Sequence, residues 1–583
     1  MTGENRTALR KSVSAVGGAV GRTQGKQWLA ILSVTLSPAL SMAGQAGQTA
    51  QVQPAQVPAP IRVRVNVVEV RVVVRDEHGK PVANLTREDF QLYDDGKPQT
   101  IANFTVETPE MRSADAAAAP SAGATEELMP ASAPERFVAL VFDDTHLSSA
   151  DLMYARNSAT AFLDGLEPGD RVGLYSVSGS LNHNFTANKE ELKKALAGLS
   201  SHFAMVSRQG DCPKVSYYLA NQVDTLQDET AFRLIVNDAL HCAYGNDPKM
   251  MAQAEMLARN AVQQAMALGQ ADNNQVSDQL MAIVKWMETK PGRRTVVFIS
   301  PGVSLTNDRT RLQRVVEEAN RQRIVINTLD ARGVFTEGTF SADSGAAQTP
   351  RAMALNSQEA TEQLDLLINL ADGTGGTHYL YSNDIAGGLK QLGDDPAITY
   401  ILTFSPTAAK GDGAFHKLKV GLTEKRHYQI VARNGYYDEK KVGDSKQQVE
   451  AEIRRVLYSG TEPLDMPMDL KLAAVKNATE TKIQIMVMLG IKDVPFRKEQ
   501  DRNCNVLMTS VAIFDDNGNY MMGGEKDLEL RLTAPTYEQF LNTGVPMRAE
   551  YTVKPGRYLV RQLVREGEGG RMSVREGMVE VPQ

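Results

Sequence analysis

The residues best suited to chemistry follow an apolar run, Val138 to Phe142, where Asp143 and Asp144 precede His146. A histidine beside two carboxylates could act as a general base. Such a base needs a nucleophile within hydrogen-bond reach, and nothing in the sequence positions one near His146. The Gly-x-Ser-x-Gly, His-Glu-x-x-His, Walker and Gly-x-Gly-x-x-Gly signatures are also absent. We therefore predict that the protein is not an enzyme, with a hydrolase that uses His146 as the weakest alternative.

Alternating strands and helices must position these residues. Between about 135 and 395, apolar strands such as Phe137 to Phe142 and Thr295 to Ile299 alternate with helical segments. This alternation predicts an α/β domain with a doubly wound, mainly parallel sheet of six strands, covered by helices on both faces. The carboxyl ends of parallel strands meet on one side of the sheet, so Asp143 and Ser300 should lie side by side there.

Segments on both sides of this domain have β character. The β unit 61–107 has too few strands to stand alone, so we expect it to share one sandwich with the strands of 396–440, with the α/β domain as an insert. Residues 466–583 alternate strands with hairpin turns, which is typical of an immunoglobulin-like sandwich. The remaining segments are linkers at 44–60 and 108–134 and a helical connector at 441–465.

The N-terminal segment predicts export from the cytoplasm. Basic residues precede an apolar run from Trp28 to Ala43 that ends in small residues, which is the pattern of a cleavable signal peptide over 1–43. An uncleaved N-terminal anchor is the alternative. No later segment is long and apolar enough to cross a bilayer. We expect the body of the chain to be secreted or periplasmic.

The three cysteines predict one disulfide and no metal site. An oxidising compartment permits a disulfide, and the expected pair is Cys212 with Cys242, which bracket one local insert and leave Cys504 free. There is no CxxC or Cys/His spacing for a metal site.

The chain has 63 basic and 70 acidic residues, for a net charge of −7, and its basic residues are dispersed. This distribution argues against a nucleic-acid partner.

Several motifs resemble the von Willebrand factor A domain family and, within it, the bacterial secreted proteins called VWFA-related. Cys-Pro-Lys at 212–214 with the later Cys242, and Arg433-Asn434-Gly435-Tyr436-Tyr437, look characteristic of that group. The resemblance therefore covers most of the chain after the signal peptide. The motifs of the α/β domain that resemble the wider family are 143–148, 168–173, 185–188, 327–333 and 375–377.

The resemblance implies a metal-ion-dependent adhesion site. In the family, Asp-x-Ser-x-Ser, a later threonine and an aspartate after a middle strand hold Mg²⁺, with one position left open for a partner's carboxylate. The residues of this chain that match the ligand positions, and could still hold Mg²⁺ with water completing the octahedron, are Asp143, Asp144, Thr145, Ser148 and Ser300.

The ligand set is nevertheless depleted. If Asp143 leads the motif, Leu147 replaces the second hydroxyl, and if Asp144 leads, His146 replaces the first. Ser300-Pro301-Gly302 stands where the family has Thr-Asp-Gly, and no Gly-Thr pair marks the loop threonine. We therefore expect a degenerate adhesion site, with helix capping by the two aspartates as the structural alternative.

Together these patterns predict a secreted or envelope-associated binding or adhesion protein. Its partner would be a protein or glycan recognised at the carboxyl ends of the sheet, where the insert 200–246 should also lie. The predicted partner-binding residues are His146, Thr186 and Gly302. The competing class is a structural envelope scaffold. Its β sandwiches would mediate assembly, and the carboxyl ends of the sheet would bind no partner.

Overall fold

The computed structural model describes a large part of the chain after residue 67. The described ranges are 68–77, 79–108, 135–202, 212–304, 309–334, 349–394, 398–406, 414–424, 427–438, 446–458, 463–476 and 480–582. The expected signal peptide (1–43), the first linker (44–60) and most of the second linker (108–134) lie outside the described residues. No described helix has the length and hydrophobicity needed to cross a membrane.

The centre of the molecule is a six-stranded sheet in the order β10-β9-β8-β5-β6-β7. Every neighbouring pair is parallel except β6 and β7, which are antiparallel. The predicted α/β fold with a mainly parallel sheet is thus confirmed. The strands are β5 (Arg136–Phe142), β6 (Asp170–Ser176), β7 (Asn182–Thr186), β8 (Arg293–Ile299), β9 (Ile324–Leu329) and β10 (His378–Tyr379).

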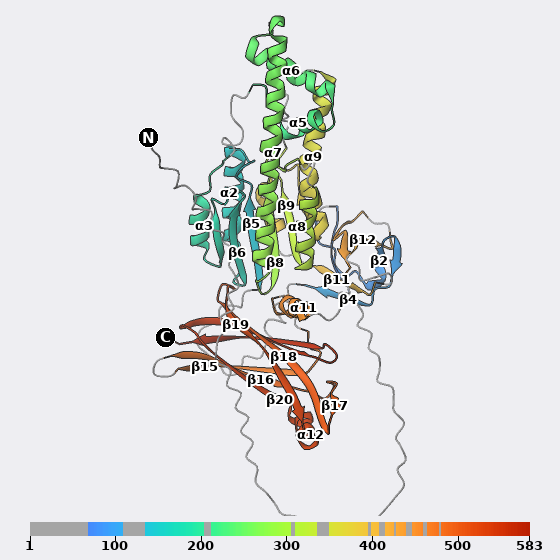
Figure 1. The fold of residues 1–583 in the computed structure, drawn as a ribbon, viewed down its shortest axis with the longest axis vertical. Helices are drawn as coiled ribbons and strands as arrows, with labels where there is room; N and C mark the ends of the chain where they lie inside the picture. The colour runs from blue at the N-terminus through green and yellow to red at the C-terminus, as the bar shows by residue number, and fades with distance from the viewer. Residues whose placement is uncertain are drawn as a thin grey trace, which may run out of the picture.

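Helices cover both faces of this sheet (Figure 1). Phe137, Ala139 and Val141 of β5 belong to the hydrophobic core on one face, and Val138 and Phe142 to the core on the other, because side chains alternate along a strand. The first core is covered by α7 (Met251–Met287), α8 (Arg309–Arg321) and α9 (Pro350–Thr374). The second is covered by α2 (Ser149–Asp164), α3 (Lys189–Ala197) and α10 (Ile385–Gly393).

A helical extension stands at the carboxyl ends of the strands (Figure 1). The helix α7 is 37 residues long and runs antiparallel to β8, so its first half projects past the sheet. There it packs with the start of α9 and with α5 (Tyr217–Asp224), α6 (Glu229–Tyr244) and the short η2 (Pro248–Met250). The helical structure that begins in the predicted insert therefore continues along α7.

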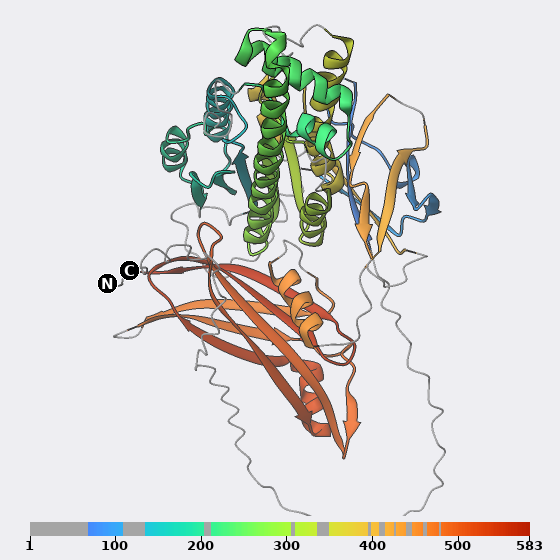
Figure 2. The ribbon, with the colours of Figure 1, turned by 45° about the horizontal axis from the view of Figure 1, so that its top comes forward.

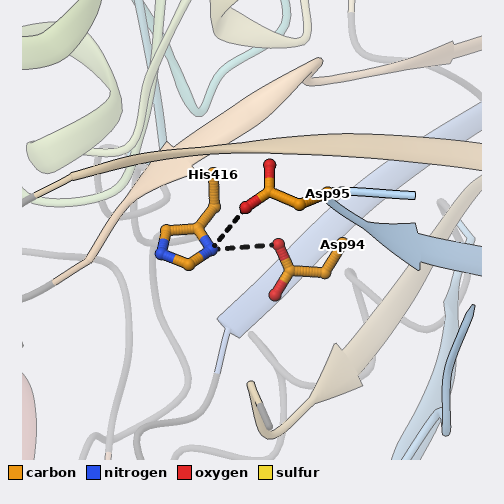
Figure 3. Close-up of side chains that lie close together, drawn as sticks. All are labelled: Asp94, Asp95 and His416. Carbon is orange, nitrogen blue, oxygen red and sulfur yellow. Dashed lines mark hydrogen bonds and ion pairs between the residues drawn. The ribbon is translucent and has the colours of Figure 1, made fainter. Parts of the chain in front are cut away.

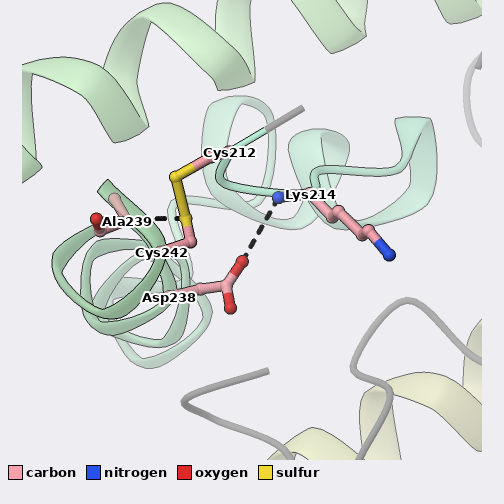
Figure 4. Close-up of a disulfide and its surroundings, with 5 residues drawn as sticks. All are labelled: Cys212, Lys214, Asp238, Ala239 and Cys242. Atoms are coloured by element: carbon pink, nitrogen blue, oxygen red, sulfur yellow. Dashed lines mark hydrogen bonds between the residues drawn. A yellow bond between two sulfur atoms is a disulfide. The ribbon is translucent and has the colours of Figure 1, made fainter. Parts of the chain in front are cut away.

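The disulfide Cys212–Cys242 joins the entry of the extension to the last turn of α6 (Figure 4). Its two Cα atoms are 5.9 Å apart, and the bond closes a separation of 30 residues. Lys214 N donates to Asp238 Oδ2 beside it at 3.2 Å. Cys504 is free and buried. The predicted pairing is confirmed.

Strands from both sides of the α/β domain form one β sandwich. Its sheets have the orders β13-β1-β11-β4 and β14-β12-β2-β3. Val72 and Leu92 from before the α/β domain share a core with Tyr400 and Leu418 from after it. The elements are β1 (Val68–Arg75), η1 (Arg87–Asp89), β2 (Phe90–Asp94), β3 (Lys97–Gln99), β4 (Asn103–Glu107), β11 (Thr399–Phe404), β12 (Phe415–Leu422), β13 (Gln429–Ala432) and β14 (Gly435–Tyr437).

The C-terminal domain consists of two antiparallel sheets around a separate core. One sheet holds β15 (Met468–Lys476), β16 (Thr481–Leu489) and β20 (Val545–Thr552). The other holds β17 (Arg497–Glu499), β18 (Arg502–Asp515), β19 (Tyr520–Leu532), β21 (Gly556–Glu566) and β22 (Met572–Val581). Two helices complete the domain, α11 (Lys446–Tyr458), which packs on β18 and β21, and α12 (Ala534–Thr543).

The C-terminal domain contacts the α/β domain at the end opposite the helical extension (Figures 1 and 2). The turn between β18 and β19 reaches the amino ends of the parallel strands. Arg171 donates to the Asp516 carbonyl oxygen at 3.0 and 2.8 Å, and Lys290 Nζ donates to Asn519 Oδ1 at 2.7 Å. This contact leaves the carboxyl ends of the strands free of the C-terminal domain.

Candidate functional site

Polar side chains gather at the carboxyl rim, which we define as the residues that directly follow β5, β6, β8 and β9. Because Phe142 pairs with Ile299, the next residues of the two strands, Asp143 and Ser300, are neighbours. Ser300 Oγ donates to Asp143 Oδ2 at 2.6 Å, and both residues are completely buried. The structure therefore brings these two predicted site residues together.

A histidine stands against the other oxygen of Asp143. Asp143 Oδ1 accepts hydrogen bonds from Thr145 Oγ1 at 2.9 Å and from His146 N at 3.2 Å, and His146 Nδ1 lies 2.8 Å from it. Burial alone would raise the carboxyl pKa, but the charge of His146 and the hydrogen bonds outweigh it, so the pKa of Asp143 is lowered. Burial alone would lower the imidazole pKa, but Asp143 outweighs it, so the pKa of His146 is raised. Each member of the pair therefore favours the charged form of the other.

Asp144 points to different partners from its neighbour. Its Oδ1 accepts from Ser178 N at 2.9 Å, and its Oδ2 accepts from Ser180 Oγ at 3.0 Å and from Ser178 Oγ. His202 Nδ1 lies 3.0 Å from the same Oδ2. The two adjacent aspartates thus diverge, one toward β8 and one toward the loop after β6, and each contacts a different histidine.

The end of β9 supports the turn after Ser300. Asp330 is buried, and Arg332 contacts it through Nε at 3.0 Å and a terminal nitrogen at 2.9 Å. The same guanidinium donates to the Pro301 carbonyl oxygen at 2.6 Å. Gly302 has a φ of +82°, and a Cβ there would lie 2.0 Å from the Gln363 carbonyl oxygen, so only glycine fits this turn without strain.

The helix α7 closes one side of the carboxyl rim. Gln279 donates to the Ser176 carbonyl oxygen at 3.1 Å, and Asn273 donates to the Ser304 carbonyl oxygen at 2.6 Å. Asp272 of the same helix is close enough to His146 and Asp143 to interact with their charges. Burial and the Asp143 charge raise the pKa of Asp272 and outweigh the charge of His146. The charge of a third carboxyl group therefore acts on the His146 and Asp143 pair.

Two other predicted residues have different surroundings. Ser148 is the N-cap of α2, since its Oγ accepts from Asp151 N at 3.2 Å and donates to Asp151 Oδ2 at 2.7 Å. The alternative in which the two aspartates cap this helix is therefore wrong.

Thr186 pairs with Val172 near the start of β6, toward the amino ends of the parallel strands. Gly302 does lie at the carboxyl rim, where its N donates to Ser300 Oγ at 2.9 Å.

Magnesium does not fit the carboxyl rim as the side chains are arranged. Mg²⁺ requires an octahedron of oxygen ligands. One oxygen of Asp143 faces the Ser300 hydroxyl and the other faces Thr145 and the His146 ring. The His146 ring therefore stands beside the carboxylate where the family resemblance implies a cation, and the Ser148 hydroxyl is engaged by Asp151.

Sequence reasoning missed several residues that lie at the carboxyl rim or interact with it. Ser178 and Ser180 could have been found, because they follow the apolar run 171–177 as Asp143 follows Val138 to Phe142. His202 and Asp272 carry no such signal, because each comes from a segment whose position depends on packing. The exposed fractions of the side chains are 20% for His146 and 28% for His202, so both histidines can be reached from solvent above buried carboxylates.

No protein-family model matches this chain, and no curated protein matches it. Its sheet order and flanking sheets define an α/β domain with a mainly parallel six-stranded sheet, emerging from a β sandwich and followed by a second β domain, which is the fold class that the resemblance implies.

Among solved structures, the chain is similar to the conserved hypothetical protein BatB from Bacteroides thetaiotaomicron. The identity is 13% over 44% of this chain and 95% of that one, with a TM-score of 0.21. Chicken interferon gamma receptor alpha chain (11% identity, 29% of this chain, 67% of that one, TM-score 0.13) and dimeric latent PorU from Porphyromonas gingivalis (11%, 32%, 14%, TM-score 0.12) are also similar. At these TM-scores, the likenesses carry no argument about function.

Proposed function

We propose that this chain is a non-enzymatic binding protein that recognises a protein or glycan partner at the carboxyl rim. The observation that carries the proposal is the pair of histidines, His146 and His202, held partly exposed above the buried carboxylates of Asp143 and Asp144. Their hydrogen bonds fix the orientation of both rings before a partner arrives. A partner that binds them therefore loses little free energy to the ordering of side chains.

The charges of the carboxyl rim favour a polar, uncharged contact surface on the partner. Asp143 and Asp144 each contact one imidazole, and the charge of Asp272 also acts on His146. An anionic partner would be repelled by the carboxyl groups, whereas hydroxyl and amide groups could bond to the exposed parts of the two rings. The hydroxyls of a glycan or the polar side chains of a protein loop have this chemistry.

The contacts of His146 support a role in binding rather than in catalysis. Its Nδ1 faces Asp143 Oδ1, and the nearest hydroxyl, Thr145 Oγ1, lies 3.0 Å from that nitrogen. The same hydroxyl donates to Asp143, so its proton is directed to the carboxylate rather than to the ring. A nucleophile needs the opposite arrangement, in which the ring accepts the hydroxyl proton.

We further propose that the protein acts outside the cytoplasm, in the envelope or after secretion. Disulfides persist in oxidising compartments, and Cys212–Cys242 joins two elements of the helical extension. Fractionation of cells that express the full chain, with thiol labelling of Cys212 and Cys242, tests this proposal. Recovery of the chain in the cytoplasm with both thiols reduced would contradict it.

Binding at the carboxyl rim is tested by capture of envelope proteins and by a glycan array with the full chain. The variants His146→Gln and His202→Gln should weaken capture of a partner at least tenfold. The matched control is His427→Gln, which replaces an exposed histidine of the β sandwich and should have no effect. Equal capture of the partner by all three variants would show that the carboxyl rim is not part of the binding site.

A structural scaffold is the second candidate, favoured by exposed apolar residues on the C-terminal domain. Met486 and Met488 of β16 are 37% and 41% exposed, and Met521 of β19 is 50% exposed. Apolar side chains on a strand surface often mark contacts with other proteins. Capture that is lost with Met486→Lys and Met488→Lys, but not with His146→Gln, would favour the scaffold over binding at the carboxyl rim.

A further inference from the structure

A cluster of ligand atoms lies in the β sandwich, in a domain separate from the carboxyl rim. Asp94 Oδ1 and Asp95 Oδ2 each lie 3.2 Å from His416 Nδ1 (Figure 3). Within the described part of the chain, this is the one group in which three atoms from His, Cys, Asp or Glu lie within 4.8 Å of one another. The aspartates end β2 and begin its turn, and the histidine is on β12, which pairs with β2.

The three side chains are held from behind by further hydrogen bonds. Tyr436 donates to Asp94 Oδ2 at 3.0 Å, and Lys417 N donates to Asp95 Oδ1 at 2.9 Å. Each carboxylate therefore uses one oxygen for support and directs the other toward the imidazole nitrogen. The His416 ring also stacks on Tyr436, with 5.0 Å between centroids. Metal ligands are oriented in this way by outer hydrogen bonds.

The turn after β2 has the backbone that brings both carboxylates to the same point. Asp95 and Gly96 have φ of +48° and +77°, the pair of positive values of a tight hairpin. Asp95 N also donates to the Lys417 carbonyl oxygen at 2.8 Å, so the turn is fastened to β12 through both of its contacts with Lys417. The exposed fractions of the Asp94 and His416 side chains are 1% and 9%, so a bound ion would be shielded from water on that side.

A third carboxyl group, that of Asp438, is buried and directly follows β14, two residues after Tyr436. The charges of Asp94, Asp438 and Asp95 all act on the Tyr436 hydroxyl, which places the three carboxyl groups near it. Buried carboxyl groups are paired with a positive group or coordinate a metal ion, so these surroundings are suited to a cation.

We propose that Asp94, Asp95 and His416 form a binding site for a divalent transition metal, for which Zn²⁺ is the best match. Imidazole nitrogen with carboxylate oxygen is a Zn²⁺ ligand set, whereas Mg²⁺ and Ca²⁺ prefer oxygen ligands alone. Ligands at about 2.0 to 2.1 Å from a tetrahedral ion are separated by roughly 3.3 Å. Both nitrogen-to-oxygen separations, at 3.2 Å, are close to this value. Water supplies the fourth ligand.

The site joins two parts of the chain that are far apart in sequence. Asp94 and His416 are separated by 322 residues, which include the whole α/β domain. A metal ion bound by both would fasten the hairpin of β2 and β3 to β12 and stabilise the sandwich from which the α/β domain emerges. The concentration of available metal ions would then control the stability of the β sandwich that holds the α/β domain. The bound ion itself would not contact the carboxyl rim.

Isothermal titration of the chelator-treated full chain with Zn²⁺ tests the proposal. We expect one Zn²⁺ per chain at this site and a higher melting temperature with Zn²⁺. Asp95→Asn should weaken binding at least tenfold, and because asparagine tolerates positive φ and its amide oxygen can accept from Lys417 N, the turn should keep its fold. His416→Gln should remove the site, and Tyr436→Phe should weaken binding by about 10- to 100-fold.

Two matched controls separate this site from other histidines. His427→Gln replaces an exposed histidine of the same sandwich, and His146→Gln replaces the one at the carboxyl rim. Both should bind Zn²⁺ as the unaltered chain does. The proposal is overturned if the unaltered chain binds no Zn²⁺, if Asp95→Asn and His416→Gln bind it with unchanged affinity, or if Mg²⁺ or Ca²⁺ binds more tightly than Zn²⁺.

Discussion

Replacing Asp143 by asparagine should destabilise the α/β domain strongly. The carboxylate is completely buried and faces the donors of Thr145, His146 and Ser300. An asparagine has one acceptor oxygen, so its NH₂ group must face either Ser300 or the donors of Thr145 and His146. Removing one partner of a buried ion pair typically costs about 3 to 5 kcal/mol. We expect a loss of about 3 to 5 kcal/mol in the free energy of unfolding at pH 6.

The size of this loss should depend on pH. The pKa of His146 is raised above 6.5, so its contribution is complete below 6.5 and is lost as pH rises through the pKa of the folded state. The pKa of Asp143 is lowered below 3.8, so its contribution is complete above 3.8 and is lost as pH falls through the pKa of the folded state. The difference between Asp143→Asn and the unaltered chain should therefore be largest between about pH 4 and 6.5.

Urea unfolding at several pH values, followed by a probe within the α/β domain, measures this difference. The control is Asp164→Asn, because the Asp164 side chain is 61% exposed and its pairing with Lys193 is screened by water. That variant should unfold almost as the unaltered chain does at every pH. A loss below about 1 kcal/mol for Asp143→Asn at pH 6, or a loss that stays constant as the pH rises from 6 to the alkaline limit of folding, would refute the ion pair as an important source of stability.

Three further predictions concern other contacts. Cys242→Ser should destabilise the helical extension by roughly 3 to 4 kcal/mol, seen as faster proteolysis there, and unchanged cleavage would contradict this. Gly302→Ala should lower the melting temperature, at a cost of about 1 to 3 kcal/mol, because its Cβ would meet the Gln363 carbonyl. Arg171→Ala removes both hydrogen bonds to Asp516, so calorimetry should show the C-terminal domain unfolding in a separate transition, whereas a single unchanged transition would count against the contact.

The sequence by itself determined the fold class and the disulfide. Apolar strands such as Val138 to Phe142 are hydrophobic on both faces, and only a sheet covered by helices on both sides buries them fully. Cys212 and Cys242 are close along the chain, so a local pattern was sufficient to pair them. These features depend on residues close together in sequence or on the periodic spacing of apolar residues. Both can be recognised from the amino-acid sequence alone.

The tertiary structure alone decided what each polar group contacts. Asp143 and Asp144 are adjacent in sequence, yet one bonds to Ser300 and the other to Ser178, because successive side chains leave the strand end in different directions. The choice of Ser148 rather than an aspartate as the cap of α2 also depended on where the helix begins.

Long-range strand pairing decided the second cluster. The run Tyr93-Asp94-Asp95-Gly96 is typical of a turn, and it carries no sign of His416, which is more than 300 residues away. The register that places Leu418 opposite Asp94 is set by the shared core of the sandwich. A shift of one residue would turn His416 to the other face, and no local pattern near residue 94 carries that information.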